Sequence, residues 1–178
     1  TLANLRVLIG LDPARAQAML DRLIAYLRAT LQASRLPLHP LSVEFDRVAD
    51  YLALMAIRMG PRLAVAFDLP DNLAAVPVPP LLLQPLVENA IKHGLEPKVA
   101  GGRIAVAARR TGGALTLTVR DTGIGPGAAG TAGTGFGLEQ VRTRLATLHG
   151  ARASLTLAAA DDAEGGALAT LVLPLPTP

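Results

Sequence analysis

One short segment, Glu88-Asn89-Ala90-Ile91-Lys92-His93-Gly94, gathers polar side chains on an otherwise apolar stretch. On an α-helix, Glu88 lies one turn from Lys92 and Asn89 one turn from His93, so the four would form one polar face. A carboxylate, a carboxamide and an ammonium suit a magnesium-phosphate group, because magnesium takes oxygen ligands and lysine offsets phosphate charge. Taken alone, the segment fits a solvated helix face with a capping histidine better, and this alternative stays open.

A second cluster, Asp121-Thr122-Gly123-Ile124-Gly125, follows the alternating segment 115–119. An acidic residue at a strand end can present its carboxylate to the amino group of a ligand, and glycines let the backbone approach that ligand closely. Aspartate and glycine are also the commonest turn residues, and on this pattern alone an ordinary turn is favoured.

A third cluster, Gly133-Thr134-Gly135-Phe136-Gly137-Leu138, comes just before a predicted helix. Glycine-rich loops that lead into helix N-termini bind phosphates through free backbone N–H groups and the helix dipole. The pattern lacks the lysine and Ser/Thr of a P-loop, and its last glycine comes one residue too early for the dinucleotide fingerprint.

Hydrophobic spacing predicts the elements that position these clusters. Two helices come first: one follows Asp12-Pro13, with a stripe of Leu20, Leu23, Ile24, Leu27 and Leu31, and one runs from a cap at Ser42 to Gly60-Pro61. The rest predicts about five strands and two helices, with a hairpin at Gly112-Gly113 and a glycine-rich loop at 123–137. The strands are expected at 63–69, 104–106, 115–119, 155–157 and 168–173. The helices are expected at 79–93, where Gly94 would end the helix, and at 138–149, with an apolar stripe of Leu138, Val141, Leu145 and Leu148. The predicted boundary divides the chain into 1–60 and 61–178.

Composition narrows the classes of protein. The 178 residues are 51% hydrophobic and contain no cysteine, so we expect a packed core without disulfides or thiolate metal sites. The net charge of +3 comes from dispersed arginines, and three Phe, two Tyr and no Trp offer few rings for stacking bases, so no nucleic-acid partner is expected. The longest uncharged apolar stretch, 73–87, is broken by four prolines and is not expected to cross a bilayer.

The order and spacing of the three clusters resemble the N box, first glycine box and second glycine box of the GHKL ATPase superfamily. The segment 79–94, with the sequence PPLLLQPLVENAIKHG, is similar almost residue for residue to the signature of LytS-type sensor histidine kinases. Further matches extend the resemblance over essentially the whole chain: Leu41-Ser42-Val43-Glu44, Tyr51-Leu52, Arg58 and Arg144-Leu145.

The resemblance implies roles for the residues of all three clusters. Asn89 would coordinate magnesium, and Glu88 would lie near the metal-bound water or the reacting phosphate. Lys92 and His93 would face the phosphates. The adenine amino group would donate to the carboxylate of Asp121, in a pocket shaped by Gly123 and Gly125. The expected hinge and phosphate-contacting end of the ATP lid are Gly133, Thr134, Gly135, Phe136, Gly137 and Leu138.

The implied fold is the Bergerat α+β two-layer sandwich, a mixed sheet with helices on one face, preceded by two N-terminal helices. The implied function is the ATP-binding catalytic core of a sensor histidine kinase, a protein histidine kinase whose cofactors are ATP and Mg²⁺. The implied partners are a response-regulator receiver domain and a second copy of the chain, joined through the N-terminal helices. We expect this region to be cytoplasmic, and the resemblance leaves open a membrane anchor upstream.

Two departures from the family pattern carry further expectations. The phosphorylated histidine of the family precedes residues like those at 1–5, and neither His39 nor His149 has its context, so the chain alone should not autophosphorylate at the usual site. Ala167 stands where the family usually has a threonine near the adenine pocket, unless Thr170 serves instead.

Two other functions are consistent with the same residues. One is another GHKL-type ATPase, of the mismatch-repair or chaperone kind, in which Glu88 activates water. The other is a non-catalytic module whose altered pocket supports only nucleotide binding or dimerisation.

Overall fold

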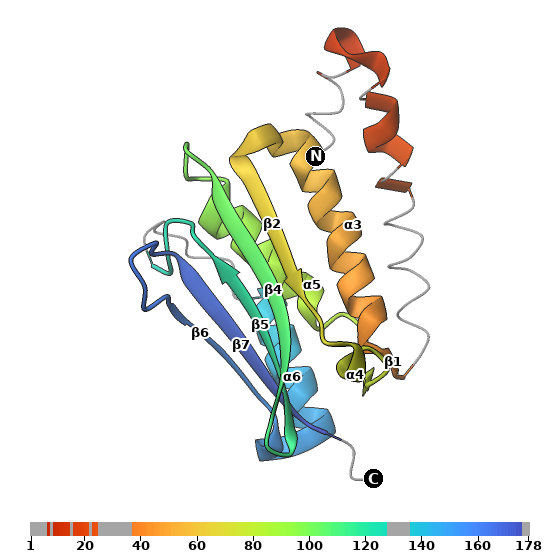
Figure 1. Cartoon of the computed structure of the whole chain (residues 1–178), viewed down its shortest axis with the longest axis vertical. Helices are drawn as coiled ribbons and strands as arrows, with labels where there is room; N and C mark the ends of the chain where they lie inside the picture. Colours follow the sequence, from red (N-terminus) through yellow and green to blue (C-terminus); the bar gives the residue numbers. More distant parts are fainter. Residues whose placement is uncertain are drawn as a thin grey trace.

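A computed structural model describes residues 7, 9–14, 16–21, 23–24, 37–127 and 136–175 (Figure 1). Most of the described residues before 25 are helical. The elements that follow are β1 (His39–Pro40), α3 (Leu41–Met59), η1 (Gly60–Arg62), β2 (Leu63–Asp68), α4 (Asp71–Ala74), β3 (Pro77–Val78), α5 (Leu83–Asn89), η2 (Ala90–Leu95), β4 (Gly102–Thr111), β5 (Ala114–Asp121), α6 (Phe136–His149), η3 (Gly150–Arg152), β6 (Ser154–Ala159) and β7 (Ala167–Pro174).

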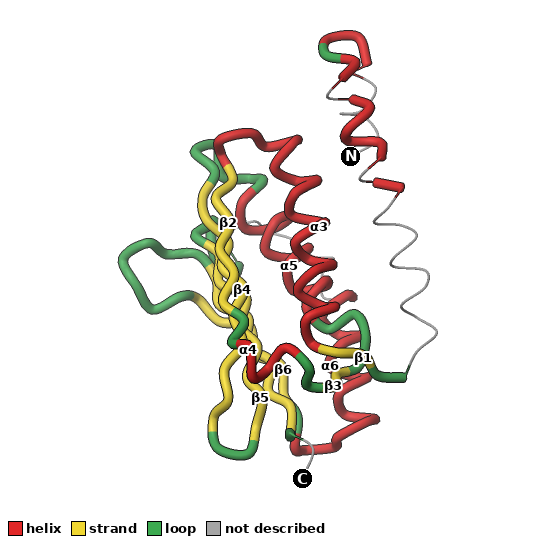
Figure 2. The backbone as a smooth tube through the Cα atoms, turned by 45° about the vertical axis from the view of Figure 1, so that its right-hand side comes forward, coloured by secondary structure: helices red, strands yellow, loops and turns green. Residues whose placement is uncertain are grey.

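Five strands form one mixed sheet in the order β2-β4-β5-β7-β6. The edge strand β2 runs parallel to β4, and every other neighbouring pair is antiparallel. Figure 2 shows α3, α5 and α6 on one side of this sheet. The predicted two-layer sandwich, with a mixed sheet and helices on one face, is therefore confirmed.

Alternation along the strands explains why the helices cover only one face. In β5, Leu115, Leu117 and Val119 are buried, whereas Thr116 and Thr118 between them are partly exposed on the opposite face. β7 repeats the pattern from Ala167 to Leu173 and pairs with β5 along its whole length. Because successive side chains of a strand point to opposite faces, this spacing creates one apolar face for the helices to cover.

Helix α3 buries the stripe that its sequence predicts: Phe45, Val48, Leu52, Met55 and Met59. It begins at Leu41 rather than at a Ser42 cap, and no side chain caps its N-terminus. The predicted stop is confirmed, because Gly60 has a φ of 60° that favours glycine. α3 shares one hydrophobic core with the sheet and α5, and the expected division at residue 60 stays a prediction.

The helix expected at 79–93 differs from the structure at both ends. Pro79-Pro80 precede a turn in which Leu81 has a φ of 62°, so α5 begins only at Leu83. Its far end continues as the π-helical turn η2 through Gly94 to Leu95. Gly94 therefore does not terminate the helix, and its role lies in a close backbone approach described below.

Beside the other predicted strands and helices, the structure shows a second, small sheet and exposed apolar side chains that the sequence patterns did not predict. The five strands are confirmed, and Gly112-Gly113 joins β4 to β5. A small two-stranded sheet, β1 with β3, was not expected because both strands contain proline. In β2, Val65 and Phe67 remain 37% and 43% exposed, because an edge strand has a covering neighbour on one side only. In the helix α6, Leu148 is exposed, while the rest of its predicted stripe is buried.

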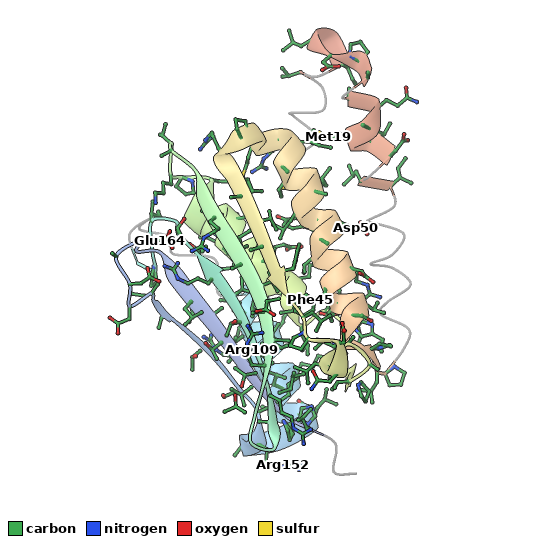
Figure 3. The ribbon with its side chains drawn as sticks, in the orientation of Figure 1. Met19, Phe45, Asp50, Arg109, Arg152 and Glu164 are labelled. Atoms are coloured by element: carbon green, nitrogen blue, oxygen red, sulfur yellow. The ribbon has the colours of Figure 1, made fainter. Side chains whose placement is uncertain are left out.

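Among the described N-terminal residues, Met19 is fully buried in the core and Ala16 is also buried (Figure 3). Of the predicted first stripe, Leu23 is half-buried and packs against the core, Leu20 and Ile24 are exposed, and Leu27 and Leu31 lie outside the described residues. Within the described part of the chain, no helix combines the length and hydropathy needed to span a membrane.

Candidate functional site

A pocket of about 170 Å³ opens where α5 and η2 meet the end of β5. Six residues of the first two predicted clusters line it together: Asn89, Ala90, His93, Gly94, Asp121 and Gly125. The remaining lining residues are Pro126, Gly127, Leu157 and Ala167. The structure therefore brings the first and second clusters to one cavity, although the 26 residues 95–120 separate them in the chain.

Asp121 is the most buried acidic group of this pocket, with 2% of the residue exposed. Its Oδ1 accepts a hydrogen bond of 2.9 Å from the backbone N–H of Gly123. Burial raises the pKa of the Asp121 carboxyl, against the opposing effects of the backbone N–H groups of Gly123 and Ala167 and of the charges of Arg120 and Lys98. The carboxylate is thus oriented but poorly solvated, and a donor from a ligand would compensate part of that cost.

Close backbone contact around Asp121 depends on glycines. A Cβ atom on Gly94 would lie 2.5 Å from Oδ1 of Asp121, and one on Gly123 would overlap the backbone of Gly94. Gly166, with a φ of 93°, packs against the Asp121 backbone in the same way. The N–H of Ile124 donates to the Gly94 carbonyl over 3.1 Å. Three chain segments therefore meet here with no side chain between them.

The π-helical turn η2 carries His93 to the same pocket as Asn89. Both residues are half-buried. Burial lowers the pKa of His93, and the neighbouring charge of Lys92 lowers it further. The imidazole is therefore more readily neutral than a free histidine. π-turns occur often at functional sites, and this one displaces the residues after Asn89 from α-helical spacing.

Glu88 and Lys92 lie outside the lining of this pocket. Oε1 of Glu88 accepts a hydrogen bond of 2.7 Å from Nε2 of Gln84. Burial, aided by the nearby charge of Glu88 and opposed by Arg58, raises the pKa of Tyr51 to about 12. Glu88 therefore faces α3, Lys92 is exposed, and the roles expected of both stay predictions.

The third cluster is only partly within the described residues. Gly133, Thr134 and Gly135 lie outside them, as does the side chain of Phe136. Gly137 lies close to Pro85 of α5, and Leu138 is buried in the hydrophobic core. Leu138 therefore packs α6 onto the sheet, and the lid role expected of this cluster stays a prediction.

Sequence reasoning missed several lining residues. Gly94 was interpreted as a helix terminator. Gly166 packs against the Asp121 backbone without lining the pocket, and nothing in the local pattern distinguishes it from an ordinary turn glycine. Leu157 reaches the pocket from the edge strand β6, which only the sheet order reveals. The suggestion that Thr170 replaces the missing threonine is wrong, because Thr170 lies an odd number of residues from Ala167 and so on the opposite face of β7.

Ala167 itself lines the pocket. Restoring the threonine that the family usually has at this position tests whether its hydroxyl contributes to nucleotide binding. We expect Ala167→Thr to tighten nucleotide binding about 2- to 10-fold, because one added hydrogen bond contributes about 0.5–1.5 kcal/mol. Titration with a fluorescent ATP analogue measures the change. Ala167→Val, with similar volume and no hydroxyl, is the control, and equal effects of the two variants would contradict a hydrogen-bonding role.

Two protein-family models match the chain and define the class of protein to which it belongs. The model of the histidine kinase-, DNA gyrase B- and HSP90-like ATPase family matches residues 80–177, and a histidine kinase model matches residues 1–63. The chain belongs to the GHKL ATPase superfamily and, within it, to the sensor histidine kinases.

Curated relatives show which group of sensor histidine kinases the chain resembles. The sensor protein LytS of Staphylococcus haemolyticus is 32% identical over 166 residues, which cover 87% of this chain and 28% of that protein. The sensor histidine kinase BtsS of Escherichia coli is 31% identical over 161 residues, which cover 90% of this chain and 28% of that protein. The LytS-type resemblance is thus confirmed, and the chain spans about 28% of the length of these relatives.

Solved structures agree on the fold. The histidine kinase domain of a blue-light activated kinase from Erythrobacter litoralis EL346 superposes with a TM-score of 0.57 at 18% identity, covering 97% of this chain and 83% of that chain. The catalytic domain of histidine kinase ThkA gives 0.57 at 16% identity, covering 78% and 94%. At these identities the likeness shows the shared architecture alone.

Proposed function

We propose that this chain binds Mg-ATP and presents its γ-phosphoryl group to a histidine upstream of the chain, from which the group passes to an aspartate of a response-regulator receiver domain. The observation that carries the proposal is that Asn89 and Asp121, from separate elements, line one pocket in a member of this kinase family. Phosphoryl transfer needs positioning and charge neutralisation more than covalent help from protein groups, and this pocket supplies positioning groups.

Each end of the nucleotide has a matching group. Asp121 would accept a hydrogen bond from the adenine amino group, with Gly125 lining the pocket beside the ring and the N–H of Gly123 holding the carboxylate in place. Asn89 and His93 would lie toward the phosphates. Gly127 ends the described part of the loop that leads from the pocket to the glycine-rich segment 128–135 and α6. That segment would close over the triphosphate.

The donor set fits magnesium. Among the described residues, no group of three or more histidine or acidic side chains could hold a metal by itself. Magnesium keeps several waters and is commonly held by one or two protein oxygens together with substrate phosphates, so the amide oxygen of Asn89 is an appropriate ligand. When bound, the ion neutralises phosphate charge.

The larger assembly belongs to the same proposal. The N-terminal region, 1–60, would join two copies of the chain, and 61–178 would form the cytoplasmic ATP-binding domain. Support comes from exposed apolar side chains on the described N-terminal residues: Val7, Ile9, Leu11, Leu20 and Ile24. Leu20 and Ile24, four residues apart, lie on one helix face, and exposed apolar residues at this spacing are typical of a helix that pairs with a partner helix.

Thermal unfolding with and without nucleotide tests the proposal. Saturating Mg-ATP should raise the unfolding midpoint, because a ligand that binds only the native state adds about 2.7 kcal/mol at one hundred times its Kd. Asn89→Ala should remove most of the magnesium dependence, whereas Asn72→Ala, at an exposed position of α4, should not.

The alternatives give other outcomes of the same measurement. If Mg-ATP does not change the unfolding midpoint of a folded chain, the proposal is contradicted and the non-catalytic module is favoured. The alanine at position 167, where the family usually has a threonine, supports that alternative. Steady ATP hydrolysis would favour the other GHKL-type ATPases. The contact of Glu88 with Gln84, away from the pocket lining, argues against a water-activating role.

A further inference from the structure

The turn at residues 79–82, which leads into α5, is held by two charged side chains from two other helices. Glu44 reaches it from α3 and binds its N–H groups. Arg144 reaches it from α6, and its Nη1 donates a hydrogen bond of 2.5 Å to the Pro80 carbonyl. The three helices that cover the sheet are therefore joined at one turn.

The Glu44 carboxylate is saturated with backbone donors. The N–H of Leu81 donates to Oε1 over 2.8 Å, and those of Leu82 and Leu83 donate to Oε2 over 2.7 and 3.0 Å. Only 1% of Glu44 is exposed. The first N–H groups of a helix have no partner within it, and α5 has no side-chain cap of its own, so Glu44 serves as a cap supplied by another helix.

The charge of Glu44 is maintained although the group is buried. Burial alone would raise its pKa, but hydrogen bonds from His39 and from the backbone of Leu83 and Leu81 outweigh it and lower the pKa. Nε2 of His39 lies 2.9 Å from the carboxylate, and Nη1 of Arg47 lies 3.5 Å away. Burying a charged carboxylate costs free energy, and the hydrogen bonds that compensate for this cost also fix the geometry of the turn.

The turn itself holds a strained residue. Leu81 is, among the described residues, the one non-glycine residue with a positive φ, at 62°. A side chain in the left-handed region brings Cβ too close to the following carbonyl oxygen, so this conformation is strained. Strain of this kind persists where the surroundings enforce it, and the bonds from Glu44 and Arg144 on either side of Leu81 do so.

The position of this turn bears on the pocket because α5 is short. It has seven residues, so it is about 10 Å long. Glu44 binds the N–H of its first residue, Leu83, Arg144 holds the turn before it, and Asn89 is its last residue. A tilt at one end of so short a helix displaces the other end by a similar amount.

We propose that Glu44 and Arg144 are positioning residues that act through the 79–82 turn to set where Asn89 lies relative to Asp121. The inference rests on the proposed function, since it predicts an effect on nucleotide affinity. Because Arg144 belongs to α6, the same turn also connects α6 to the helix that carries Asn89.

Nucleotide titration of two pairs of variants tests the inference. Glu44→Gln keeps the shape of the side chain but points donors at backbone N–H groups, and we expect the Kd for Mg-ATP to rise about tenfold. Asp50→Asn, on the outer side of α3, is its control and should bind as the parent does (Figure 3). Arg144→Gln should also weaken binding, and its control is Arg142→Gln on the exposed side of the same helix.

A rescue variant separates positioning from mere stability. Glycine adopts the Leu81 conformation without strain, so Leu81→Gly should restore most of the affinity lost in Glu44→Gln. All titrations are made at a temperature where circular dichroism shows each variant folded. If Glu44→Gln does not fold, the Arg144→Gln and Arg142→Gln pair alone decides.

The outcomes are distinct. Parent-like affinity in folded Glu44→Gln and Arg144→Gln would overturn the inference and leave both residues a structural role. Weak binding that Leu81→Gly does not restore would also overturn it, because the turn would not be the link. Failure of the parent chain to bind Mg-ATP would defeat the proposed function, and the inference with it.

The acid dependence of stability gives an independent check on the Glu44 charge. Because the pKa of Glu44 is lowered in the folded chain, its stabilising contribution is present above the ordinary value of 4.5 and is lost as the pH falls through the folded-state value. We expect the unfolding midpoint of the parent to fall more steeply below pH 4.5 than that of Glu44→Gln. His39 and Arg47, which face Glu44, are unchanged in both chains.

Discussion

Asp121→Asn should weaken ATP binding about 10- to 100-fold and reduce the preference for ATP over GTP. A hydrogen bond to a charged group contributes about 1.5–3 kcal/mol, and 1.4 kcal/mol corresponds to a factor of ten. Asparagine keeps one acceptor oxygen for the Gly123 N–H, so the pocket itself should persist. Competition titrations with ATP, GTP and inorganic triphosphate measure the loss and its base specificity.

Stability should respond differently from affinity. Burial raises the pKa of Asp121, so the contribution of this group to stability is present below its ordinary pKa and is lost as the pH rises through the folded-state value. At neutral pH the buried charge is therefore a cost, and Asp121→Asn should not lower the unfolding midpoint. Parent-like ATP affinity in this variant would show that the adenine assignment is wrong.

Gly94→Ala should abolish measurable ATP binding, an expected loss of at least about 100-fold. The added methyl group would lie 2.5 Å from Oδ1 of Asp121, and under 3.0 Å something must shift. The carboxylate is held by the Gly123 backbone, which itself touches Gly94, so it cannot move aside without opening the site. Interiors are close-packed, and even one added methyl group is felt.

Gly113→Ala is the matched control for this substitution. Gly113 lies in the hairpin between β4 and β5, and a Cβ atom there would meet no heavy atom within 4 Å. The Gly113→Ala variant should therefore bind ATP as the parent chain does. Circular dichroism and the unfolding midpoint establish that both variants are folded. Retention of ATP binding by folded Gly94→Ala would contradict the close packing described for this site.

Local periodicity was sufficient for the sheet and for α3. The alternation of Leu115, Leu117 and Val119 with threonines has a physical cause, a strand buried on one face, that acts within the segment itself. The three- and four-residue spacing from Phe45 to Met59 has an equally local cause. Elements of this kind could be predicted from the sequence because each residue's environment follows from its immediate neighbours.

The ends of α5 could not be predicted, because they depend on partners distant in sequence. Prolines at 79–80 favour a helix start, but the carboxylate of Glu44 stabilises a left-handed Leu81 and delays the helix to Leu83. At the far end, glycine usually terminates a helix, yet Gly94 is needed where Asp121 approaches. In both cases a tertiary contact overrides the local preference.

The same distinction between local patterns and tertiary contacts applies to the residues of the candidate site. Asn89, His93, Asp121 and Gly125 were predicted by motif and lie together in the pocket. Glu88 was expected beside them from α-helical spacing, but side-chain contacts with α3 and the π-turn could not be inferred from one sequence. Leu157 was not part of the predicted pocket, because strand order decides which residues border it, and Ala167 was connected with the pocket only through the family resemblance.

The parallel pairing of β2 with β4 has a consequence for how the protein folds. Parallel neighbours cannot be joined by a tight hairpin, so residues 69–101 form a crossover that passes over the helical face, and α5 and η2 lie within it. Such non-local pairings form slowly, because loop-closure entropy is lost before the contacts compensate for it. Asn89 reaches Asp121 only when this crossover has closed. In refolding experiments, nucleotide capture should therefore coincide with the last, slowest phase and not with early helix formation.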